Sequence, residues 1–331
     1  MPTTAEITYT DLREHAAVRA WRELRPRQAE PERVEILQEV NKSAVYRLEG
    51  VGLGGSAVIA KRCQSAIAAI ERTVYEEILP SLPITALHYY GFIVEDDKFC
   101  WLFLEDAGRD RFSPFVDEHR VLAARWLGLM HTSAARVAAA TRLPDRGPGH
   151  YLEHLRSGRR TILRNLTNPL LHADDVALLQ TVVAQCDVLE LHWSEIEKSC
   201  DGMPSTLVHG DFRPKNVYVR TSEFGTALFP LDWETAGWGI PAADLAPARR
   251  LHPIPPFDII VYRSIVQECW SRLDIAAIQR LAIVGKIFRW LAAIHWASLG
   301  LAYEYIEKPM ARLRSYQAVL AEIIRATQWV I

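Results

Sequence analysis

The uneven distribution of strand and helix patterns along the chain is the feature that most limits how this sequence can fold. Short runs rich in β-branched and aromatic residues, separated by turn-forming residues, are concentrated in the first 106 residues. They are 34–40, 43–49, 56–62, 87–96 and 98–106, with helical patterns at 11–24 and 66–79. Beyond residue 115 helical periodicity dominates, interrupted only at 206–210, 217–220 and 227–233. This segregation predicts an α+β protein with a sheet lobe over residues 1–106 and a mostly helical lobe over 107–331.

Composition and charge exclude several classes of protein. Apolar residues make up 49% of the 331 residues, and the formal net charge of −2 favours neither nucleic acid nor an anionic membrane as a partner. The five cysteines are odd in number and include no C-x-x-C pair, which is typical of a reducing compartment. The N-terminus lacks the pattern of a signal peptide, and the most apolar window, 287–303, contains Arg289 and His295 and is too short to span a membrane. We therefore expect a cytoplasmic protein with no nucleic-acid or membrane partner, while the oligomeric state stays unknown from sequence.

Two turns in the sheet lobe are candidates for phosphate binding. The segment GVGLGG at 50–55 formally matches G-x-G-x-x-G, but a strand follows it where a dinucleotide-binding loop needs a helix, and only five residues separate Gly55 from Lys61. We interpret this segment as the tip of a β-hairpin. The preceding turn at 40–43 offers backbone N–H groups and the Ser43 hydroxyl, so it is the better candidate for phosphate binding.

Lys61 stands near the end of a predicted strand, in the run Val-Ile-Ala-Lys. An ammonium group on a half-buried strand needs an anionic partner. The helical pattern that follows supplies three carboxylates, Glu71, Glu76 and Glu77. Two readings stay open for the lysine alone: a group that binds an anion in a site, or a surface residue at a strand end.

The segment LVHGDFRPKNVYV at 207–219 places Asp211 and Asn216 in one loop between two probable strands. This spacing, H-x-D-x-x-x-x-N, is that of a phosphotransferase catalytic loop. The carboxylate can accept a hydroxyl proton and orient the oxygen, and the amide oxygen can coordinate a magnesium ion. The five-residue offset lets both side chains face the same space from one loop.

Asp232 follows the apolar run 228–231, in the sequence Leu-Asp-Trp-Glu. A carboxylate at the end of a buried strand is costly unless it is paired or bound to a metal ion, and a second magnesium ligand resolves that cost. Either motif alone could instead be a structural aspartate that caps backbone amides. Their order and spacing, together with Lys61 upstream, favour phosphoryl transfer over that structural interpretation.

These motifs together resemble the aminoglycoside phosphotransferase family, the small-molecule branch of the protein-kinase-like fold that also includes choline kinase. HGDFRPKN is similar to the catalytic loop of that family, and LDWETAGWGIPAADLA is similar to its metal-binding segment, with Asp232 and Asp244 as the two acidic positions. LGLMH at 127–131 and LFLED at 102–106 resemble the end of its first long helix and its linker strand. The resemblance covers most of 34–250 and implies a two-lobed protein-kinase-like fold with a small antiparallel sheet. The turn at 40–43 departs from the family because it lacks glycine.

The resemblance implies a role for each matching residue. Asp211 would be the catalytic base or hydroxyl orienter, and Arg213 would reach the transferring phosphoryl group or form a salt bridge. Asn216 and Asp232 would hold Mg²⁺. Residues assigned to the nucleotide are Ser43, Lys61 with Glu71 as its partner and Glu76 as second choice, and the main chain from Glu105 to Ala107, which would bind adenine. His209 would brace the loop, and Glu234 would assist the metal or face solvent.

We therefore expect an ATP- or GTP-dependent O-phosphotransferase that requires Mg²⁺ and acts on a hydroxyl of a small molecule, with an aminoglycoside or other antibiotic as the first acceptor class. The alternatives are a metabolic kinase of an amino alcohol, sugar or natural-product intermediate, and a non-catalytic nucleotide-binding member of the fold. A polycationic acceptor would need carboxylates of the helical lobe, whereas tryptophans would suit an apolar one. The candidates are Asp145, His150, Glu153, Glu190, Glu195, Glu197, Asp201, Glu268, Glu304, Trp193, Trp238, Trp270, Trp290 and Trp296. The segment HYLEH at 150–154 also matches an inverted zinc-protease signature, which metal analysis would test.

Overall fold

The computed structural model describes residues 12–40, 43–223, 225–246 and 257–327, which form two compact units. The first, the sheet unit, contains the described residues up to Ser113 together with Val137–Leu143 and Arg213–Ala236. The second, the helical unit, contains Pro114–Arg136, Pro144–Phe212 and the described residues from Gly237 onward. The division after residue 106 expected from the sequence stays a prediction.

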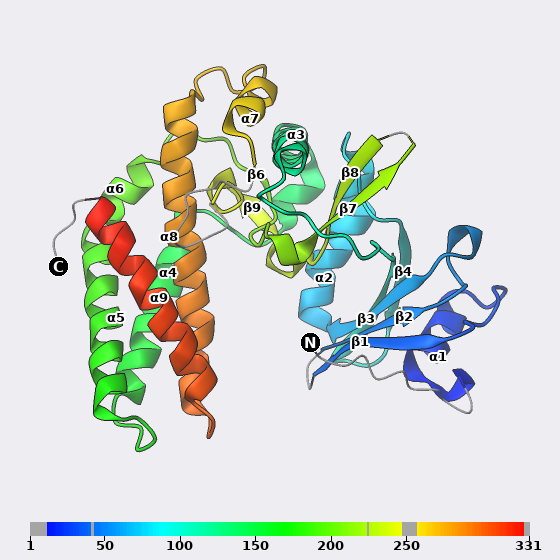
Figure 1. The fold of residues 1–331 in the computed structure, drawn as a ribbon, viewed down its shortest axis with the longest axis horizontal. Coiled ribbons are helices and arrows are strands. Elements are labelled where there is room, and N and C mark those ends of the chain that lie inside the picture. Colours follow the sequence, from blue (N-terminus) through cyan, green and yellow to red (C-terminus); the bar gives the residue numbers. More distant parts are fainter. Residues whose placement is uncertain (1–11, 41–42, 224, 247–256, 328–331) are drawn as a thin grey trace. The chain divides into compact units, whose positions relative to one another are not determined.

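The sheet unit is built on a five-stranded antiparallel sheet with the strand order β1-β2-β3-β5-β4. Figure 1 shows these strands on the blue side of the colour scale. Their bounds are β1 Val34–Val40, β2 Ser43–Leu48, β3 Val58–Gln64, β4 Tyr89–Val94 and β5 Phe99–Glu105. All five lie within the runs expected from the sequence or extend them by no more than two residues. The mixed α+β architecture is therefore confirmed.

Helices α1 (Ala16–Leu24) and α2 (Ser65–Thr73) cover opposite faces of this sheet. Trp101 and Phe103 of β5 share a buried cluster with α1, in which Trp21 lies 5.3 Å from Phe103 between ring centroids. The alternate residues of the same strand, Cys100 and Leu102, pack against α2. Because successive side chains of a strand point to opposite faces, β5 is buried on both sides, which explains its unbroken apolar sequence.

In the sheet unit, one turn agrees with the sequence-based prediction and one helix differs from it. Gly52 donates its N–H to the carbonyl of Ser56 at 2.7 Å, and Gly54 and Gly55 have positive φ angles, so 50–55 is a turn between β2 and β3 as expected. The helix expected at 66–79 is wrong in its second half. The regular helix ends at Thr73, and a π-helical turn, Val74–Ile78, and a short 3₁₀ turn follow before the chain leaves.

A β-hairpin, β7 (Val217–Ser222) and β8 (Gly225–Pro230), completes the sheet unit. A 3₁₀ turn, Pro214–Asn216, precedes it and another, Trp233–Thr235, follows it. The backbone of 110–112 runs beside β7, since Phe112 donates to Val217 O at 3.0 Å and Val219 donates to Asp110 O at 2.9 Å. The chain that leaves β5 is thereby attached to the hairpin.

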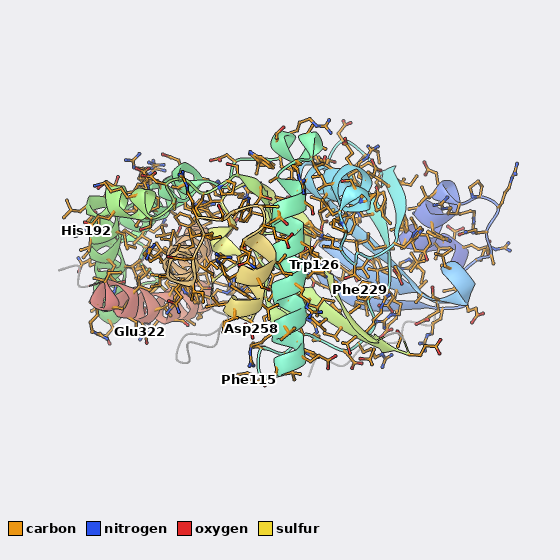
Figure 2. All side chains as sticks on the ribbon, turned by 90° about the horizontal axis from the view of Figure 1, so that it is seen from above. Phe115, Trp126, His192, Phe229, Asp258 and Glu322 are labelled. Carbon is orange, nitrogen blue, oxygen red and sulfur yellow. The ribbon has the colours of Figure 1, made fainter. Side chains whose placement is uncertain are left out.

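The helical unit contains most of the helices (Figure 1). Its elements are α3 Asp117–Ala134, α4 Pro148–Asn165, α5 Ala173–Leu191, α6 Trp193–Lys198, α7 Ile259–Val266, α8 Ile275–Leu299 and α9 Glu307–Ala326, with short strands β6 Thr206–Val208 and β9 Gly237–Gly239. Asp258, which is labelled in Figure 2, caps α7 with its side chain, and Asp274 caps α8. Helix α3 ends at Ala134, and a 3₁₀ turn, Ala138–Arg142, lies beyond it.

The apolar window at 287–303 falls mainly on α8, whose buried face includes Phe288, Leu291 and Ile294, as expected for a core helix. Close packing of α8 depends on small residues. A Cβ added at Gly285 would lie 1.7 Å from the carbonyl oxygen of Ala242, so only glycine fits there. Among the described helices, none combines the length and the apolarity that crossing a membrane requires.

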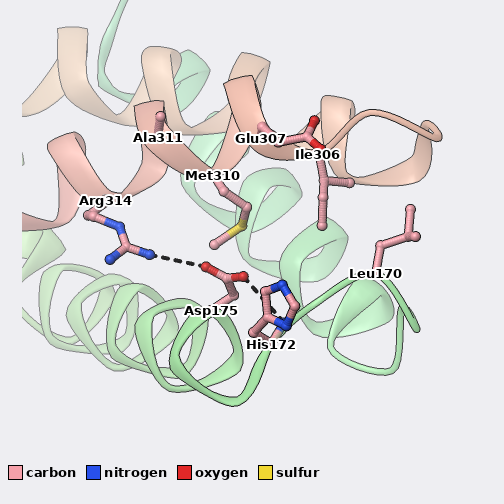
Figure 3. A pocket seen from close by; sticks show the side chains of 8 residues that line it. All are labelled: Leu170, His172, Asp175, Ile306, Glu307, Met310, Ala311 and Arg314. Atoms are coloured by element: carbon pink, nitrogen blue, oxygen red, sulfur yellow. Dashed lines mark hydrogen bonds and ion pairs between the residues drawn. The ribbon is translucent and has the colours of Figure 1, made fainter.

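A pocket of about 290 Å³ lies between the N-terminal ends of α5 and α9 (Figure 3). Arg314 pairs with Asp175 at 3.1 Å across it, and His172 and Asp175 form the capping box of α5. The other lining residues are Leu170, Ile306, Glu307, Met310 and Ala311. Arg314, Asp175 and His172 therefore already have partners within the unit.

Candidate active site

Lys61 is the centre of a buried cluster of charges in the sheet unit. Its Nζ atom lies 3.0 Å and 2.9 Å from the two carboxylate oxygens of Glu71 and 2.8 Å from Oδ1 of Asp232. The Glu71 side chain is 1% exposed, and its Oε1 also accepts the backbone N–H of Trp233 at 3.0 Å. Strand β3, helix α2 and the turn after β8 each supply one of these groups, so residues far apart in the chain converge.

The electrostatics of this cluster favour binding of a further cation. Burial alone would lower the pKa of Lys61, but the charges of Glu71 and Asp232 outweigh it and raise that pKa well above its ordinary value. Burial, followed by the charge of Asp232, raises the pKa of Glu234. Glu71 and Asp232 therefore both pair with one ammonium group, and the excess of negative charge is what a divalent ion would neutralise.

Asn216 and Asp232 stand at the same end of the β7–β8 hairpin. Val217 pairs with Pro230, and the N–H of Leu231 donates to the Asn216 carbonyl at 2.9 Å. Asn216 is 4% exposed. Asp232 adopts the left-handed conformation, with φ 68° and ψ 62°, and no other described non-glycine residue has a positive φ. Aspartate tolerates this conformation better than most residues, and such backbone is frequent at functional sites.

These two residues fit the ligand preferences of Mg²⁺. The ion takes oxygen ligands and is commonly held by one or two carboxylates with water and substrate phosphates completing its shell. One carboxylate and one amide oxygen at the end of a hairpin meet that need. Groups of three or more His, Cys, Asp or Glu side chains able to hold a metal do not occur among the described residues, so a protein-only metal cage is not the arrangement here.

The loop that carries Asp211 belongs to the helical unit and is held by the carboxylate of Asp244. His209 and Gly210 each donate a backbone N–H to Asp244 at 2.8 Å, and the N–H of Asp211 donates to Nδ1 of His209 at 3.3 Å. Gly210 has a φ of 78°, which only glycine adopts without strain. His209 is fully buried, so its ring holds the loop, and Asp211 is half-buried at the end of it.

A second layer of buried polar groups holds Asp244 in turn. Nε2 of His131 lies 3.2 Å from Asp244, and Nδ1 lies 2.9 Å from the hydroxyl of Tyr262. The carbonyl of His131 accepts the Thr206 hydroxyl at 2.6 Å, which ties α3 to strand β6 just before the loop. Burial and the nearby Asp244 charge raise the pKa of Tyr262, so it stays a neutral hydroxyl. The sequence marked His131 and Asp244 as motif positions, but it did not reveal Tyr262.

One of the boundaries between the two units falls between Phe212 and Arg213. Phe212 packs in the helical unit against Trp126 of α3, with ring centroids 5.9 Å apart; Figure 2 labels Trp126. Arg213 immediately precedes the 3₁₀ turn Pro214–Asn216 of the sheet unit, and its carbonyl accepts the N–H of Asn216 at 2.8 Å. Lys61, Glu71, Asn216 and Asp232 are thus together in one unit, and the approach of Asp211 to them stays a prediction.

The remaining nucleotide-site candidates also lie in the sheet unit. Ser43 opens β2, while residues 41–42 of the expected phosphate-binding turn lie outside the described residues. Glu105 ends β5 and Ala107 follows it, in the linker that the sequence assigns to adenine. Of the alternative partners for Lys61, Glu76 pairs with Arg72 at 2.8 Å and Glu77 pairs with Arg142, so neither is the lysine's partner.

Some of the carboxylates proposed to bind the acceptor in the helical unit pair with basic side chains. Glu190 pairs with Arg156 at 2.7 Å, and Glu195 lies 2.8 Å from His192. On α4, burial lowers the pKa of His150 to about 4 and that of His154 to about 3, so both imidazoles are neutral near pH 7. Since the described residues contain no metal-binding group of the required kind, the zinc interpretation of 150–154 has no structural support.

Comparison with known proteins gives a clear match to one family. A family model described as the phosphotransferase enzyme family matches residues 66–267, which is more than half of the chain. No curated protein sequence matches at a significant level. The matched region includes α2, the linker, the Asp211 loop and Asp232.

Solved structures with the same fold are similar over most of their length. A microcompartment-associated aminopropanol kinase has a TM-score of 0.61 and 16% identity, with 90% of this chain and 94% of that chain covered. A spectinomycin phosphotransferase in complex with ADP and spectinomycin has a TM-score of 0.55 and 12% identity, covering 91% and 94%. The GDP and kanamycin complex of APH(2")-IIia has a TM-score of 0.60 and 14% identity, covering 91% and 97%. At these identities the likeness confirms the kinase-like fold.

Proposed function

This chain belongs to the phosphotransferase enzyme family and is a small-molecule kinase, and we propose that it transfers the γ-phosphate of ATP to a hydroxyl group of a small acceptor, with Mg²⁺ as its cation. The observation that carries this proposal is the Lys61–Glu71–Asp232 cluster with Asn216 at the end of the same hairpin. One ammonium group for phosphate oxygens and two oxygen ligands for a divalent ion are the parts that phosphoryl transfer needs.

In the proposed reaction, Asp211 accepts the proton of the acceptor hydroxyl as its oxygen attacks the γ-phosphorus. The new O–P bond forms while the bond from that phosphorus to the bridging oxygen breaks, and the nucleoside diphosphate leaves with the electron pair. Lys61 donates hydrogen bonds to the α- and β-phosphate oxygens, oriented by Glu71, and Arg213 approaches the transferring group. Asn216 and Asp232 would hold Mg²⁺, which neutralises charge on the phosphates when bound. Most of the rate enhancement would come from positioning and charge neutralisation.

The linker supports the choice of nucleotide. Its main chain from Glu105 to Ala107 would bind the base, as the sequence expects. Two structural neighbours have nucleoside diphosphates in their printed descriptions, ADP in one and GDP in the other. We propose ATP as the first donor and GTP as the alternative, to be compared in the same assay.

The acceptor would be an amine-bearing alcohol, because this is the chemistry that the named neighbours share. An aminoglycoside or related antibiotic, with a role in antibiotic resistance, is the first choice. An amino alcohol is the second, since the aminopropanol kinase is as similar in fold as the antibiotic kinases. Pairing of Glu190 with Arg156 and of Glu195 with His192 leaves fewer carboxylates for a polycation, which favours testing small amino alcohols in parallel.

A panel of acceptors with ATP or GTP and Mg²⁺ tests the proposal. Nucleoside diphosphate release would be measured for aminoglycosides, spectinomycin, amino alcohols and amine-free sugars, and phosphorus NMR would identify a phosphate ester in the product. We expect one amine-bearing group to give acceptor-dependent release that Asp211→Ala abolishes. Acceptor-independent release, or equal rates in the Asp211→Ala variant, would contradict the proposed chemistry.

A further inference from the structure

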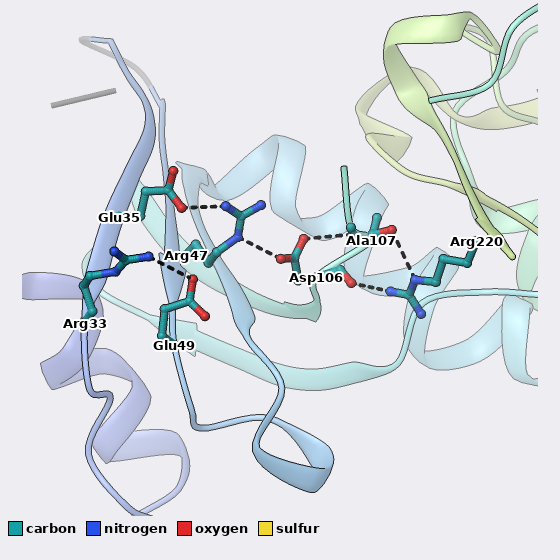
Figure 4. Close-up of polar contacts among 8 residues, drawn as sticks. Arg33, Glu35, Arg47, Glu49, Asp106, Ala107 and Arg220 are labelled. Atoms are coloured by element: carbon teal, nitrogen blue, oxygen red, sulfur yellow. Dashed lines mark hydrogen bonds and ion pairs between the residues drawn. The ribbon is translucent and has the colours of Figure 1, made fainter. Parts of the chain in front are cut away.

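The segment that follows β5, residues 105–108, is held by two arginines from other parts of the sheet unit (Figure 4). Arg220 of β7 donates from Nε to the carbonyl of Ala107 at 3.1 Å and from Nη2 to the carbonyl of Asp106. It also pairs with the carboxylate of Glu105. Its guanidinium group lies 4.4 Å from the centroid of the Phe229 ring, which orients it further. One planar side chain therefore contacts three consecutive residues of the linker.

Arg47 of β2 holds the same segment through the side chain of Asp106. Its Nε donates to Oδ2 of Asp106 at 2.7 Å, and its Nη1 donates to Glu35 at 2.5 Å. The other oxygen of Asp106 accepts the N–H of Gly108 at 3.0 Å. The Arg47 side chain is only 10% exposed, so this is a largely buried network rather than a loose surface pair.

These contacts occupy most of the main-chain groups of the linker. Glu105 donates its N–H to His88 O at 2.8 Å, and Asp106 donates its N–H to Ala57 O at 3.3 Å. The carbonyls of Asp106 and Ala107 accept from Arg220. The carbonyl of Glu105 and the N–H of Ala107 take no part in these contacts and can therefore bind a ligand. An acceptor and a donor spaced in this way complement the amino group and the adjacent ring nitrogen of adenine.

We propose that Arg220 and Arg47 are positioning residues for nucleotide binding: they hold the linker so that the Glu105 carbonyl and the Ala107 N–H are presented to the purine base. The inference rests on the proposed function, because it assigns the linker to the base of the nucleotide. Ordering a loop segment costs conformational entropy, so a linker that is already ordered binds a base more tightly than a mobile one. Neither arginine is expected to touch the transferred phosphoryl group.

A structural role and a positioning role make different predictions for ligands with and without a base. If the arginines only stabilise the fold, their loss weakens every ligand of the sheet unit equally or none of them. If they position the linker, their loss weakens a nucleotide but not tripolyphosphate, which has no base. Affinities for Mg-ADP and Mg-tripolyphosphate, measured by calorimetry on the full chain, separate these cases.

The variants are Arg220→Gln and Arg47→Gln, with Arg33→Gln as the matched control. Arg33 lies just before β1 and pairs with Glu49 at 3.8 Å without contacting the linker (Figure 4). We expect Arg220→Gln to weaken ADP about 10-fold, as loss of preorganised contacts implies, while tripolyphosphate affinity changes less than about twofold. Arg47→Gln should show the same pattern with a smaller effect, and Arg33→Gln should bind both ligands like the parent protein.

Several outcomes would overturn the inference. Parent-like ADP affinity in both Arg220→Gln and Arg47→Gln, or equal weakening of ADP and tripolyphosphate, would show that the arginines do not position the base. If thermal melting shows that Arg220→Gln does not fold, Arg220→Lys replaces it. Lysine keeps the charge opposite Glu105 but cannot reach both carbonyls as well, so ADP binding should again weaken selectively. If the parent protein bound neither ADP nor ATP, the proposed function itself would fail, and that result is distinct from selective failure of the variants.

Discussion

Replacing Lys61 by methionine should destabilise the sheet unit, because it leaves the carboxylate of Glu71 buried without its counterion. Glu71 is 1% exposed and would keep the hydrogen bond from the N–H of Trp233. Removing one partner of a buried ion pair costs about 3–5 kcal/mol. Lys61 is 14% exposed and Asp232 is 24% exposed, so screening by water places the expected loss at about 3 kcal/mol.

The double variant Lys61→Met/Glu71→Gln should recover much of that loss. Glutamine can still accept the Trp233 N–H but carries no charge, so its remaining cost is that of a weakened hydrogen bond, about 1 kcal/mol. The double variant should therefore be about 2 kcal/mol more stable than Lys61→Met.

Urea denaturation of the parent, the single variant and the double variant would measure these differences. Because the chain has two units, amide hydrogen exchange in β3 and α2 would confirm that the loss occurs in the sheet unit. If Lys61→Met were as stable as the double variant at pH 7, the Glu71 charge would not depend on Lys61, and the reasoning from the buried pair would be refuted.

Three further predictions concern other parts of the molecule. Asp211→Ala should lower acceptor-dependent turnover by about 10²–10⁴-fold, in the range expected for loss of a general base, and leave ADP affinity within about twofold; a smaller fall in turnover would remove Asp211 from the proton transfer. Gly285→Ala should lower the stability of the helical unit by at least about 3 kcal/mol, because its Cβ would collide with the Ala242 carbonyl, whereas the exposed Gly149→Ala should be neutral or stabilising; equal melting temperatures would contradict the packing argument. The folded pKa of His154 is lowered to about 3 from an ordinary 6.5, so its contribution to stability is present above pH 6.5 and is lost as the pH falls toward 3. His154→Gln should therefore make unfolding less sensitive to acid between pH 7 and 4.5, and an unchanged pH profile would show that His154 is freely protonated in the native state.

The strands and turns of the sheet were predictable because the residue patterns that specify them span only a few neighbouring positions. Runs rich in β-branched and aromatic residues, bounded by turn-forming residues such as those at 50–55, placed the strands to within about two residues. The helix at 66–79 was overextended, since apolar periodicity continues through the π-helical turn that interrupts it. Strand β9 was missed because its three residues, Gly237–Gly239, have little strand propensity and owe their conformation to pairing with β6.

The candidate site was likewise predictable only in part. The spacing of Asp211, Asn216 and Asp232 identified the chemistry and the family, which the family match confirms. Spacing did not identify Arg47 or Arg220, because in sequence each is an ordinary polar residue on a strand. Their contacts with the linker join β2 and β7 to residues far away in the chain, and no local pattern records such a contact.

The sequence by itself determined which reactive groups this protein carries and in what order they occur, since carboxylates, amides and an ammonium group at set intervals reflect the chemistry of phosphoryl transfer. Only the tertiary structure decided that Asp232 also pairs with Lys61 and which arginines hold the linker. The physical reason is that hydrogen-bond and charge partners are chosen within a few ångströms in space, whereas the groups concerned lie up to 171 residues apart along the chain.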